Sequence, residues 1–226
     1  MLPMLFVALG FSACGSGGGE PLSSEGEVTI TLPEPGYDSG VSVEEALLKR
    51  RSIRDYTSQA LTLNDVSQLL WAAQGITDPA GLRAAPSAGA TYPLEAYVVI
   101  GNVKGVIPGI YRYEPEGHQL LKVVSGEKRQ ELAQAALNEQ FVAQAAIDIV
   151  ITAIYERTTA RYGERGIRYV HMEAGHAAQN VYLQAVAMNL GTVVIGPFYD
   201  DQVKEILNLP DNEVPLYIMP VGRIKD

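Results

Sequence analysis

The feature of this sequence that most constrains its fold is one long helical stretch, Gly166–Leu190. Its apolar residues recur at helical spacing and form a single stripe rich in small side chains: Val170, Ala174, Ala177, Val181, Ala185 and Met188. Such small side chains leave room for a neighbouring backbone to come close. We therefore interpret the stretch either as the central core helix of the domain or as a helix shared with a second subunit.

Shorter apolar segments on both sides of this stretch predict strands separated by further helices. The predicted strands cover residues 28–32, 96–100, 109–113, 119–124, 147–154, 193–195 and 216–221. Helices are predicted after the cap Ser42, from the cap Asn64 to a stop at Gly75, at 127–137 and at 200–207. Strands interrupted by separate helices indicate a single α+β or mixed α/β domain, which we place at residues 41–226.

The N-terminal segment is different in composition from the rest of the chain. Residues 1–13 are apolar and uncharged, too short to span a bilayer, and typical of the apolar part of a secretory signal. Cys14 follows small residues and precedes a glycine-rich tether, as in a bacterial lipoprotein signal. Residues 1–14 therefore predict a signal segment lipidated at Cys14, followed by a flexible linker at 15–40, in a protein of the cell envelope. The alternative is a misassigned start codon and a cytoplasmic protein.

Charge and composition exclude several classes of function. A formal net charge of −9 argues against nucleic-acid binding, which needs a basic surface, and 19% charged residues are too few for a disordered chain. With one cysteine, neither a disulfide nor a zinc ribbon forms within the chain. His171 and His176 are five residues apart and do not share a helix face, so we interpret them as structural or interface residues and expect no metal site.

The usual catalytic arrangements of side chains do not occur in the sequence, which suggests that a bound cofactor carries the chemistry. Ser87 is not in a nucleophile elbow, and no dinucleotide or Walker loop is found. Instead, four cations and a hydroxyl lie within Lys49–Arg54. Because guanidinium groups match phosphate oxygens in pairs, this segment predicts an anion site; the alternative is a solvated cap at a helix C-terminus.

Two further segments and the C-terminal end complete this pattern. Residues 83–93 combine small residues and prolines, which let a flat group approach the backbone, with hydroxyl groups on Ser87 and Thr91. A plain connecting loop is the alternative for this segment. In residues 191–198, Gly196 offers a backbone N–H to the edge of a cofactor, and Arg223 near the C-terminus supplies another phosphate partner.

In this order and spacing the segments resemble the nitroreductase superfamily of flavin enzymes, in particular the SagB/ThcOx-type dehydrogenase branch. The motifs that carry the resemblance are R-R-S-I-R-D-Y, P-S-A-G-A-T-Y-P, V-V-I-G-P-F-Y-D-D and P-V-G-R, and they extend over about residues 43–224. The resemblance implies an α+β, nitroreductase-like FMN-binding fold, with a mixed central sheet flanked by helices. It also implies a homodimer in which both subunits contribute to each flavin site, and a role for the long helix in the dimer.

Site residues follow from the same resemblance, position by position. Arg50, Ser52 and Arg54, with Arg51 as a weaker candidate, would hold the phosphate and ribityl chain, and Arg223 would complete the phosphate site. The isoalloxazine ring would be lined from the partner subunit by a loop comprising Pro86, Ser87, Ala88 and Gly89. On the other side, Ile195 and Gly196 would pack on the ring, with the Gly196 N–H directed at the flavin N5.

The implied function is an FMN-dependent oxidoreductase that transfers hydride through N5, with NAD(P)H or another reductant as donor. No side chain is expected to act as an obligatory acid or base. The Lys-Tyr pair of the azole-forming peptide dehydrogenases does not occur here, and Pro197 removes a second backbone N–H. We therefore expect a general oxidoreductase of small molecules, whose donor becomes a quinol or a protein if Cys14 is lipidated outside the cytoplasm. The alternatives are a non-catalytic flavin or ligand-binding module at the membrane surface and a purely structural lipoprotein.

Overall fold

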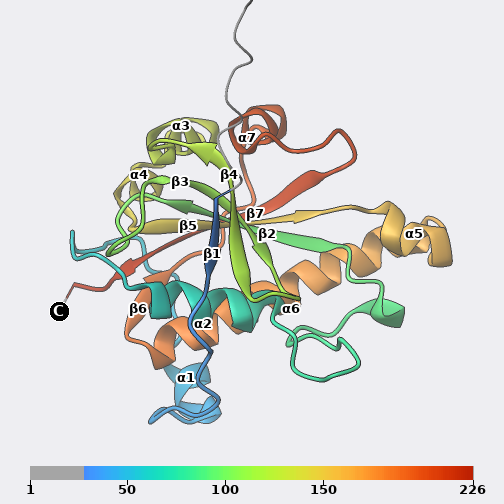
Figure 1. The fold of residues 1–226 in the computed structure, drawn as a ribbon, viewed down its shortest axis with the longest axis horizontal. Helices are drawn as coiled ribbons and strands as arrows, with labels where there is room; N and C mark the ends of the chain where they lie inside the picture. The colour runs from blue at the N-terminus through green and yellow to red at the C-terminus, as the bar shows by residue number, and fades with distance from the viewer. Residues whose placement is uncertain (1–27, 226) are drawn as a thin grey trace, which may run out of the picture.

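The computed structural model describes residues 28–225, and its framework is a seven-stranded sheet with the strand order β1-β4-β3-β2-β5-β7-β6 (Figure 1). The strands are β1 Thr29–Thr31, β2 Leu94–Ile100, β3 Gly109–Glu114, β4 Gln119–Ser125, β5 Ile147–Ala153, β6 Leu190–Thr192 and β7 Val214–Arg223. Within the described residues the strand pairs are antiparallel, and one isolated parallel bridge joins Leu61 to Val103. The predicted signal segment with Cys14 lies outside the described residues.

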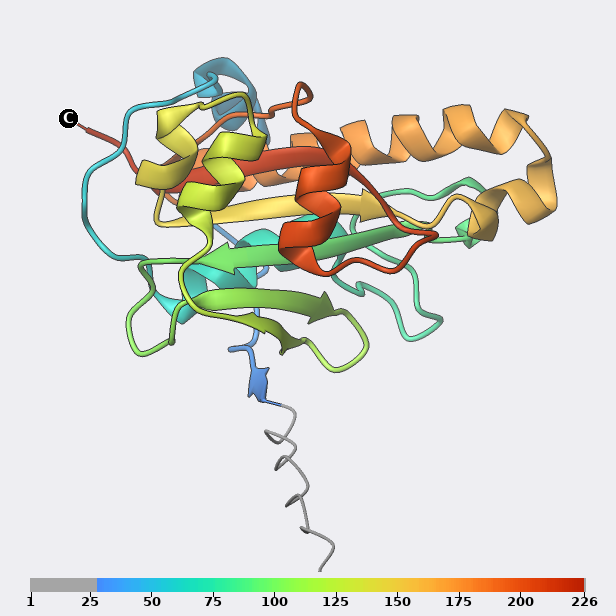
Figure 2. The ribbon, with the colours of Figure 1, turned by 90° about the horizontal axis from the view of Figure 1, so that it is seen from above.

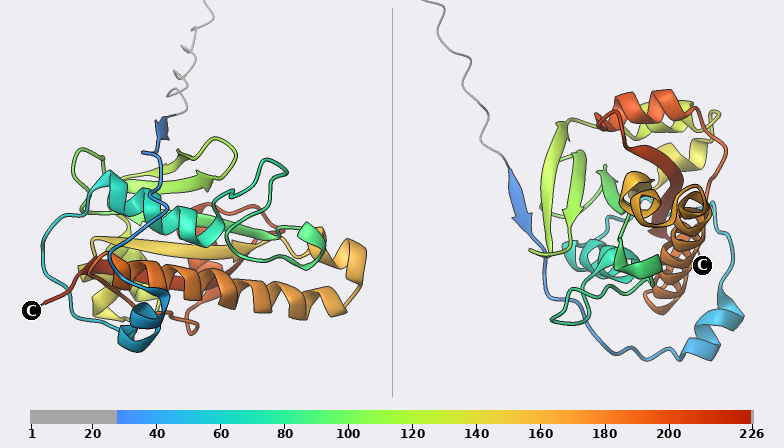
Figure 3. Two further views of the ribbon diagram at one scale, coloured as in Figure 1. Left: turned by 90° about the horizontal axis from the view of Figure 1, so that it is seen from below. Right: turned by 90° about the vertical axis from the view of Figure 1, so that its right-hand side faces the viewer.

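Helices cover both faces of this sheet. They are α1 Val43–Lys49, α2 Leu63–Gln74, α3 Arg129–Ala135, α4 Gln140–Gln144, α5 Glu156–Tyr162, α6 Arg165–Ala187 and α7 Asp200–Leu207, with a short 3-10 turn η1 at Ala88–Ala90. One hydrophobic core forms between the sheet and α2 with α6, and a second between the sheet and α3, α4 and α7 (Figures 2 and 3). The predicted α+β domain with a helix-flanked sheet is confirmed, while the homodimer stays a prediction.

The two central strands explain why the sheet needs helices on both faces. Every residue of β5 is buried, and β2 is buried except at Glu95. In β5 alternate side chains enter different cores: Ile147, Ile149 and Ile151 face α2 and α6, whereas Val150 faces the opposite helices. A strand that is apolar on both faces must be covered twice, which the sequence predicted from the apolar run at 147–154.

The alanine-rich stripe of α6 packs inside the chain. Its residues Val170 to Ala185 belong to the core between α6, α2 and the sheet. Of the two interpretations of the stripe, the structure shows the core helix. The opposite face of α6, with the exposed side chains Ile167, Met172 and His176, is the one left accessible.

Several predicted element boundaries are wrong, each for a local physical reason. α2 is capped by Thr62 and not by Asn64, because Thr62 and Asp65 form a reciprocal capping box. The predicted helix end at Leu190 is also wrong: α6 stops at Ala187, and Asn189 adopts φ 54°, which turns the chain so that Leu190 pairs with Arg223 on β7.

Further differences concern short elements. The predicted strand 193–195 is displaced to β6, and Ile195 keeps only an isolated bridge to Ile218. The short helices α4 and α5 were not predicted, because helices of this length bury too few residues to show a helical period. In contrast, α7 has the predicted bounds, and the 109–124 hairpin forms as β3 and β4.

The residues that precede α1 are tied to the sheet edge and to α2. β1 pairs with β4, and Leu32 beyond it is buried. Ser67 on α2 contacts both the Pro33 carbonyl and His118 Nε2, the latter at 2.7 Å. His118 therefore has a structural role, joining the α2 face to the N-terminal strand. No helix within residues 28–225 is long and apolar enough to cross a membrane.

Candidate functional site

The predicted arginine segment, Lys49–Arg54, lies against the edge of the sheet opposite to β1, beside β6 and the end of β7. The Ile53 N–H donates to the Thr192 carbonyl at 2.9 Å, and the Thr57 N–H donates to the Arg223 carbonyl at 2.9 Å. A Cβ atom on Gly191 would come within 2.7 Å of the Ile53 side chain, so the close approach of the two segments requires glycine there. The structure thus brings three distant parts of the sequence together.

Tyr182 on α6 connects these parts. Its hydroxyl lies 3.1 Å from Ser52 Oγ and accepts the Val194 N–H at 2.8 Å, while the Arg50 guanidinium lies 5.0 Å from the ring centroid. No motif of the sequence predicts a role for Tyr182. The signal available was a large polar aromatic residue next to a stripe of alanines, which is not specific enough to assign a role.

The arginines of this segment differ in how they are held. Arg51 is exposed and donates to the carbonyls of Leu48 and Arg50 at the end of α1, which matches the helix-cap alternative. Arg50 rests on Tyr182, and Arg54 lies 5.8 Å from the Phe141 ring. Neither Arg50 nor Arg54 has a carboxylate partner within residues 28–225. Both remain open to an anion.

Arg223 reaches the same corner of the fold but is partly engaged. Its guanidinium pairs with the Asp65 carboxylate at 2.7 Å and donates to the Met188 carbonyl at 3.3 Å. Its Nε is buried with no hydrogen-bond partner among the described residues, and the same holds for Thr192 Oγ1. Two unsatisfied buried groups beside two unpaired cations fit a site that receives an acceptor-rich ligand such as a phosphate ester.

A cavity of about 660 Å³ adjoins this corner. It lies between α2 and the C-terminal half of α6, and both partners of Arg223, Asp65 and Met188, are part of its wall. Trp71 also lines it, and the buried indole N–H of Trp71 has no partner among the described residues. The cavity and two hydrogen-bond donors without partners, Arg223 Nε and the Trp71 indole N–H, therefore occur together at this end of α6.

The residues predicted to contact the ring from one side occupy the neighbouring loop. Ile195 is buried, and its backbone exchanges two hydrogen bonds with Ile218, at 2.9 and 3.1 Å. Gly196 is exposed, and the position where its Cβ would stand is open space. Pro197 follows at the surface. A flat group can thus approach the backbone at Gly196 without displacing a side chain.

The predicted loop Pro86–Gly89 lies elsewhere, near the N-terminal half of α6. Gly89 has a left-handed backbone at φ 62°, and its carbonyl accepts a bond from Arg161 at 3.2 Å. The turn η1 after Ser87 packs on α6, where Glu173 is the nearby buried acid, whereas Tyr182, nine positions further along α6, contacts Ser52 of the arginine segment. At 1.5 Å per residue that is about 14 Å along the helix. In one copy of the chain, the two predicted parts of the site therefore lie beside different halves of α6.

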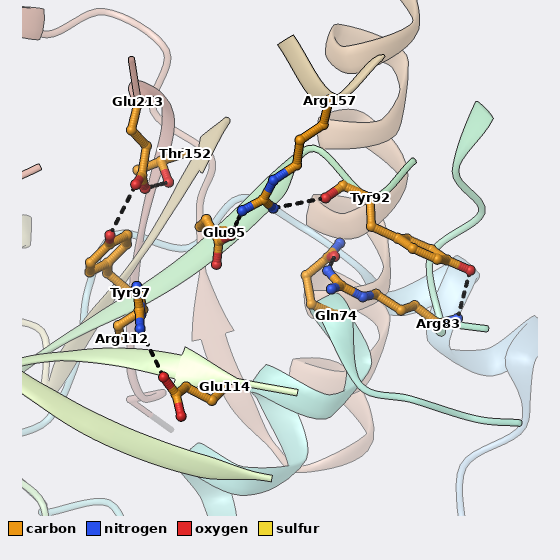
Figure 4. A network of polar contacts seen from close by, with 10 residues as sticks. All are labelled: Gln74, Arg83, Tyr92, Glu95, Tyr97, Arg112, Glu114, Thr152, Arg157 and Glu213. Carbon is orange, nitrogen blue, oxygen red and sulfur yellow. Dashed lines mark hydrogen bonds and ion pairs between the residues drawn. The ribbon is translucent and has the colours of Figure 1, made fainter. Parts of the chain in front are cut away.

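A polar network that no sequence motif predicts anchors this loop (Figure 4). Arg83 donates to Gln74 Oε1 at 2.8 Å and lies 4.6 Å from the Tyr92 ring centroid, and the Tyr92 hydroxyl accepts the Arg83 N–H at 3.3 Å. Arg157 donates to the Tyr92 carbonyl at 3.0 Å and pairs with Glu95 at 2.5 Å. The loop is therefore held at both ends by guanidinium groups.

Three carboxyl groups are buried at different places in the fold. Burial raises the pKa of Glu173 to about 7, against the opposing effects of a Ser87 hydrogen bond and the Arg83 charge. Burial also raises the pKa of Glu213, which accepts bonds from Thr152 and Tyr97. The pKa of Asp148 on β5 is raised well above its usual value by burial, and neither of its oxygens has a partner among the described residues.

Metal binding finds no support in the described part of the chain, where no group of three or more His, Cys, Asp or Glu side chains could hold an ion. His171 instead contacts the Tyr155 hydroxyl at 2.5 Å, and His176 is exposed on α6.

Comparison with known proteins identifies relatives over most of the chain. The model of the Nitroreductase family matches residues 47–223. A protein of Methanocaldococcus jannaschii named as a nitroreductase is 53% identical over 81% of this chain and 91% of its own length. A solved structure from Ralstonia eutropha, also named as a nitroreductase, has a TM-score of 0.77 at 31% identity, covering 91% of this chain and 94% of that one.

More distant relatives have more specific names. The FMN reductase (NADPH) of Bacillus subtilis is 27% identical over 79% of this chain, which spans 64% of that protein. The microcin B17-processing protein McbC of Escherichia coli is 26% identical over 86% of this chain and 76% of its own length.

Proposed function

Because the chain belongs to the nitroreductase family, we propose that it is an FMN-dependent oxidoreductase acting on small molecules. The observation that carries this proposal is that the segment Arg50–Arg54 lies beside the end of β7 at Arg223, at one edge of the sheet. There Arg50 and Arg54 have no carboxylate partner, and the buried Nε of Arg223 has no acceptor, within residues 28–225. The family likeness to reductases named for FMN and NADPH supports the same cofactor and donor.

The chain's residues divide the work of holding FMN. Arg50 and Arg54 supply charge to the phosphate without first breaking an ion pair, and Ser52 adds a hydroxyl donor whose oxygen lies beside Tyr182. Arg223 adds positive charge at the end of β7, where Asp65 fixes its guanidinium plane and its Nε keeps a hydrogen-bond donor without a partner among the described residues. Arg51, already bonded to carbonyls of α1, contributes mainly long-range charge.

Bound FMN supplies the hydride-accepting and hydride-donating ring atom N5. The protein then provides orientation and exclusion of water, for which no acid or base side chain is required. Ile195 presents an apolar edge, and the exposed backbone at Gly196 offers its N–H to the ring. NAD(P)H is the proposed donor, and it leaves before the electron acceptor takes the same place.

A second copy of the chain completes the proposed site. The loop Pro86–Gly89 lies beside α5 and the N-terminal half of α6, whereas the arginine segment contacts Tyr182 in the C-terminal half. The exposed apolar residues Ile167 and Met172 on the outer face of α6 give the dimer a surface to bury. In the dimer, the loop of one copy faces the arginines of the other.

Within the family, we place the chain near the SagB-type dehydrogenases, to which McbC-like proteins are related. The motif P-S-A-G-A-T-Y-P supports this placement. The Lys-Tyr dipeptide of the azole-forming members is absent from the full sequence, which favours a general reductase over azoline oxidation.

The test is the visible spectrum of the purified protein, followed by addition of NADH or NADPH without oxygen. We expect a yellow dimer whose flavin absorbance bleaches with one of these donors. A colourless protein that takes up no added FMN would contradict the proposal. A yellow protein that neither pyridine nucleotides nor quinols reduce would instead support the flavin-binding module.

We also propose that Cys14 is lipidated and holds the enzyme at the cell envelope. The lone cysteine after an apolar run supports this placement. Expression of the full chain and of Cys14→Ser in bacteria, followed by membrane fractionation, tests it. Recovery of both proteins in the soluble fraction would contradict lipidation and favour the cytoplasmic alternative, without bearing on the flavin site.

A further inference from the structure

A group of arginine and tyrosine side chains lies where α5 turns into α6, at one end of the sheet (Figure 1). Its members are Arg161, Tyr162, Arg165 and Tyr169, which we call the α5–α6 corner. The two tyrosine rings meet edge to face, with their centroids 5.2 Å apart. The Arg161 guanidinium lies 5.4 Å from the Tyr162 centroid, and the Arg165 guanidinium lies 5.8 Å from the Tyr169 centroid. Each cation thus lies against one ring of an aromatic pair.

The two cations of the corner are not neutralised by ion pairs. Arg161 and Arg165 are exposed, and neither has a carboxylate partner in the part of the chain that the structure describes. The neighbouring Arg157 differs, because it pairs with Glu95 at 2.5 Å. A guanidinium on an aromatic face keeps N–H donors for an acceptor. In a chain with a formal net charge of −9, the corner is therefore a place that attracts an anion.

The corner is also joined to the loop that we propose to line the flavin ring. Arg161 donates to the Gly89 carbonyl at 3.2 Å. A Cβ atom on Gly89 would come within 2.5 Å of the Tyr162 hydroxyl, so the close approach of the loop to α5 requires glycine there. Just after the loop, the Thr91 hydroxyl lies 2.7 Å from that of Thr158, a buried residue of α5. The loop and the corner therefore form one unit.

We propose that the α5–α6 corner binds an anionic group, a carboxylate or a phosphate, of the small molecule that exchanges electrons with the flavin. This inference rests on the proposed function, in which the loop of one copy lines the flavin held by the other. Because Arg161 contacts that loop, the corner lies next to the place of a molecule stacked on the ring. Arg161 and Arg165 supply charge-assisted hydrogen bonds to the anion, and the tyrosine rings hold the two guanidinium groups in place.

The anion can belong to either reactant. NADPH carries a phosphate on its ribose that NADH lacks, and 4-nitrobenzoate carries a carboxylate that nitrobenzene lacks. Comparison within each pair therefore isolates the anionic group and shows which reactant supplies it. The chemistry at the ring is the same within each pair, so a change in flavin binding or in the ring's environment affects both members alike.

The first experiment measures binding to the oxidised, FMN-loaded protein through the change in flavin absorbance. The ligands are 4-nitrobenzoate with nitrobenzene, and NADP⁺ with NAD⁺. We expect Arg161→Ala combined with Arg165→Ala to weaken the anionic member of at least one pair by about 5–20-fold, since an exposed charge contact contributes up to about a factor of five. The neutral member should bind as before. Added salt should weaken the anionic ligand in the wild type and have less effect in the variant.

The second experiment measures kcat/KM for the same pairs, with NADPH and NADH as donors. Arg165→Ala and Arg165→Glu are the sharpest variants, because the described contact of Arg165 is with Tyr169 and not with the loop. The ratio of the anionic to the neutral substrate should fall about 5-fold in Arg165→Ala and further in Arg165→Glu. Arg161→Lys, which keeps the charge, should retain more of the ratio than Arg161→Ala.

Arg112→Ala is the matched control, because Arg112 is a partly exposed arginine that pairs with Glu114 on β3, away from the corner. Both of its ratios should equal those of the wild type. Ratios and affinities that stay unchanged in the double variant and in Arg165→Glu overturn this inference and leave the proposed function standing. Protein that binds no FMN overturns the proposed function itself. Should the double variant fail to fold, Arg165→Glu alone decides between these outcomes.

Discussion

Two arginine-bearing regions lie along α6, and they differ in what their guanidinium groups contact. Near its C-terminal half, Arg50 rests on the Tyr182 ring, and Arg54, four residues further along the same segment, lies on Phe141 of α4. Neither has a carboxylate partner within residues 28–225. Near its N-terminal half, Arg83 and Arg157 are bonded to Gln74, to Tyr92 and to a carboxylate. The second pair is used to hold a loop, whereas the first pair keeps its charge available for a ligand.

The difference teaches how to separate binding residues from structural ones when both are arginine. A cation on an aromatic face keeps its N–H donors free, because the ring interacts with the charge and not with the hydrogens. A cation bonded to a carbonyl or carboxylate has committed those donors. We therefore expect substitutions in the first region to change ligand affinity and substitutions in the second to change stability.

The largest effect should come from removing two cations of the first region. Arg50→Ala combined with Arg54→Ala should weaken FMN binding by at least about 100-fold, since each charge-assisted hydrogen bond contributes roughly 1.5–3 kcal/mol. Equilibrium dialysis of FMN against the purified variant measures this. Arg112→Ala is the control, because Arg112 pairs with Glu114 at the surface. Full flavin occupancy in the double variant would show that the phosphate lies elsewhere.

The next effect is the dependence of stability on pH through Glu173 in the second region. The pKa of Glu173 rises from about 4.3 in the unfolded chain to about 7 in the folded protein, because the side chain is buried. Its contribution to stability is therefore complete below about pH 4 and is lost as the pH rises to about 7. Between those pH limits the wild type should lose about 2–4 kcal/mol of its free energy of unfolding, and Glu173→Gln should not show this loss. Urea unfolding at several pH values measures it, and equal slopes in both proteins would contradict it.

Arg83→Ala should lower the free energy of unfolding by about 1.5–3 kcal/mol, because it leaves Gln74 Oε1 and the buried Glu173 without their cation. The pKa of Glu173 should rise further in this variant, since the Arg83 charge normally lowers it. Chemical denaturation and a pH titration of the Glu173 carboxyl group provide the two readouts. If instead FMN affinity fell as far as in the double arginine variant, with stability unchanged, the two regions would not differ in the proposed way.

The smallest effect belongs to Arg157. Its ion pair with Glu95 is partly exposed, with the Arg157 side chain 37% accessible, so solvent screens it. We expect Arg157→Ala to cost about 0.5–1 kcal/mol of stability and to leave the arginine segment untouched. Thermal unfolding compared with Arg112→Ala, another partly exposed pair, measures the difference. A cost near that of Arg83→Ala would mean that the Tyr92 carbonyl contact matters more than the ion pair.

Local sequence patterns predicted the elements that depend on local interactions. The bounds of α7 follow from acidic residues in its first turn and a left-handed Asn208 after its last, both visible as residue types at its ends. The cap of α2 could not be chosen in this way, because Thr62 and Asn64 are both good caps and only the side chain of Asp65 decides between them.

The candidate site was predicted in its parts and not in its arrangement. The motifs predict Arg50 and Ser52 as anion ligands, but their common neighbour Tyr182 is 130 positions from Ser52 in the sequence. The same is true of Arg83 and Glu173, whose roles follow from the packing of α2 on α6. Patterns of period and charge contain no information on such pairings. For that reason the sequence predicts a phosphate site at the arginine segment and does not predict what supports the loop Pro86–Gly89.

The position of β1 has a consequence for how the molecule is oriented when it is attached to something. β1 and β6 are the two outermost strands of the sheet, and the arginine segment runs beside β6. With strands about 4.8 Å apart, six spacings separate these margins by about 29 Å. The chain upstream of residue 28 therefore joins the molecule at the margin remote from Arg50. The proposed tether and the proposed ligand would then lie at opposite margins of the sheet.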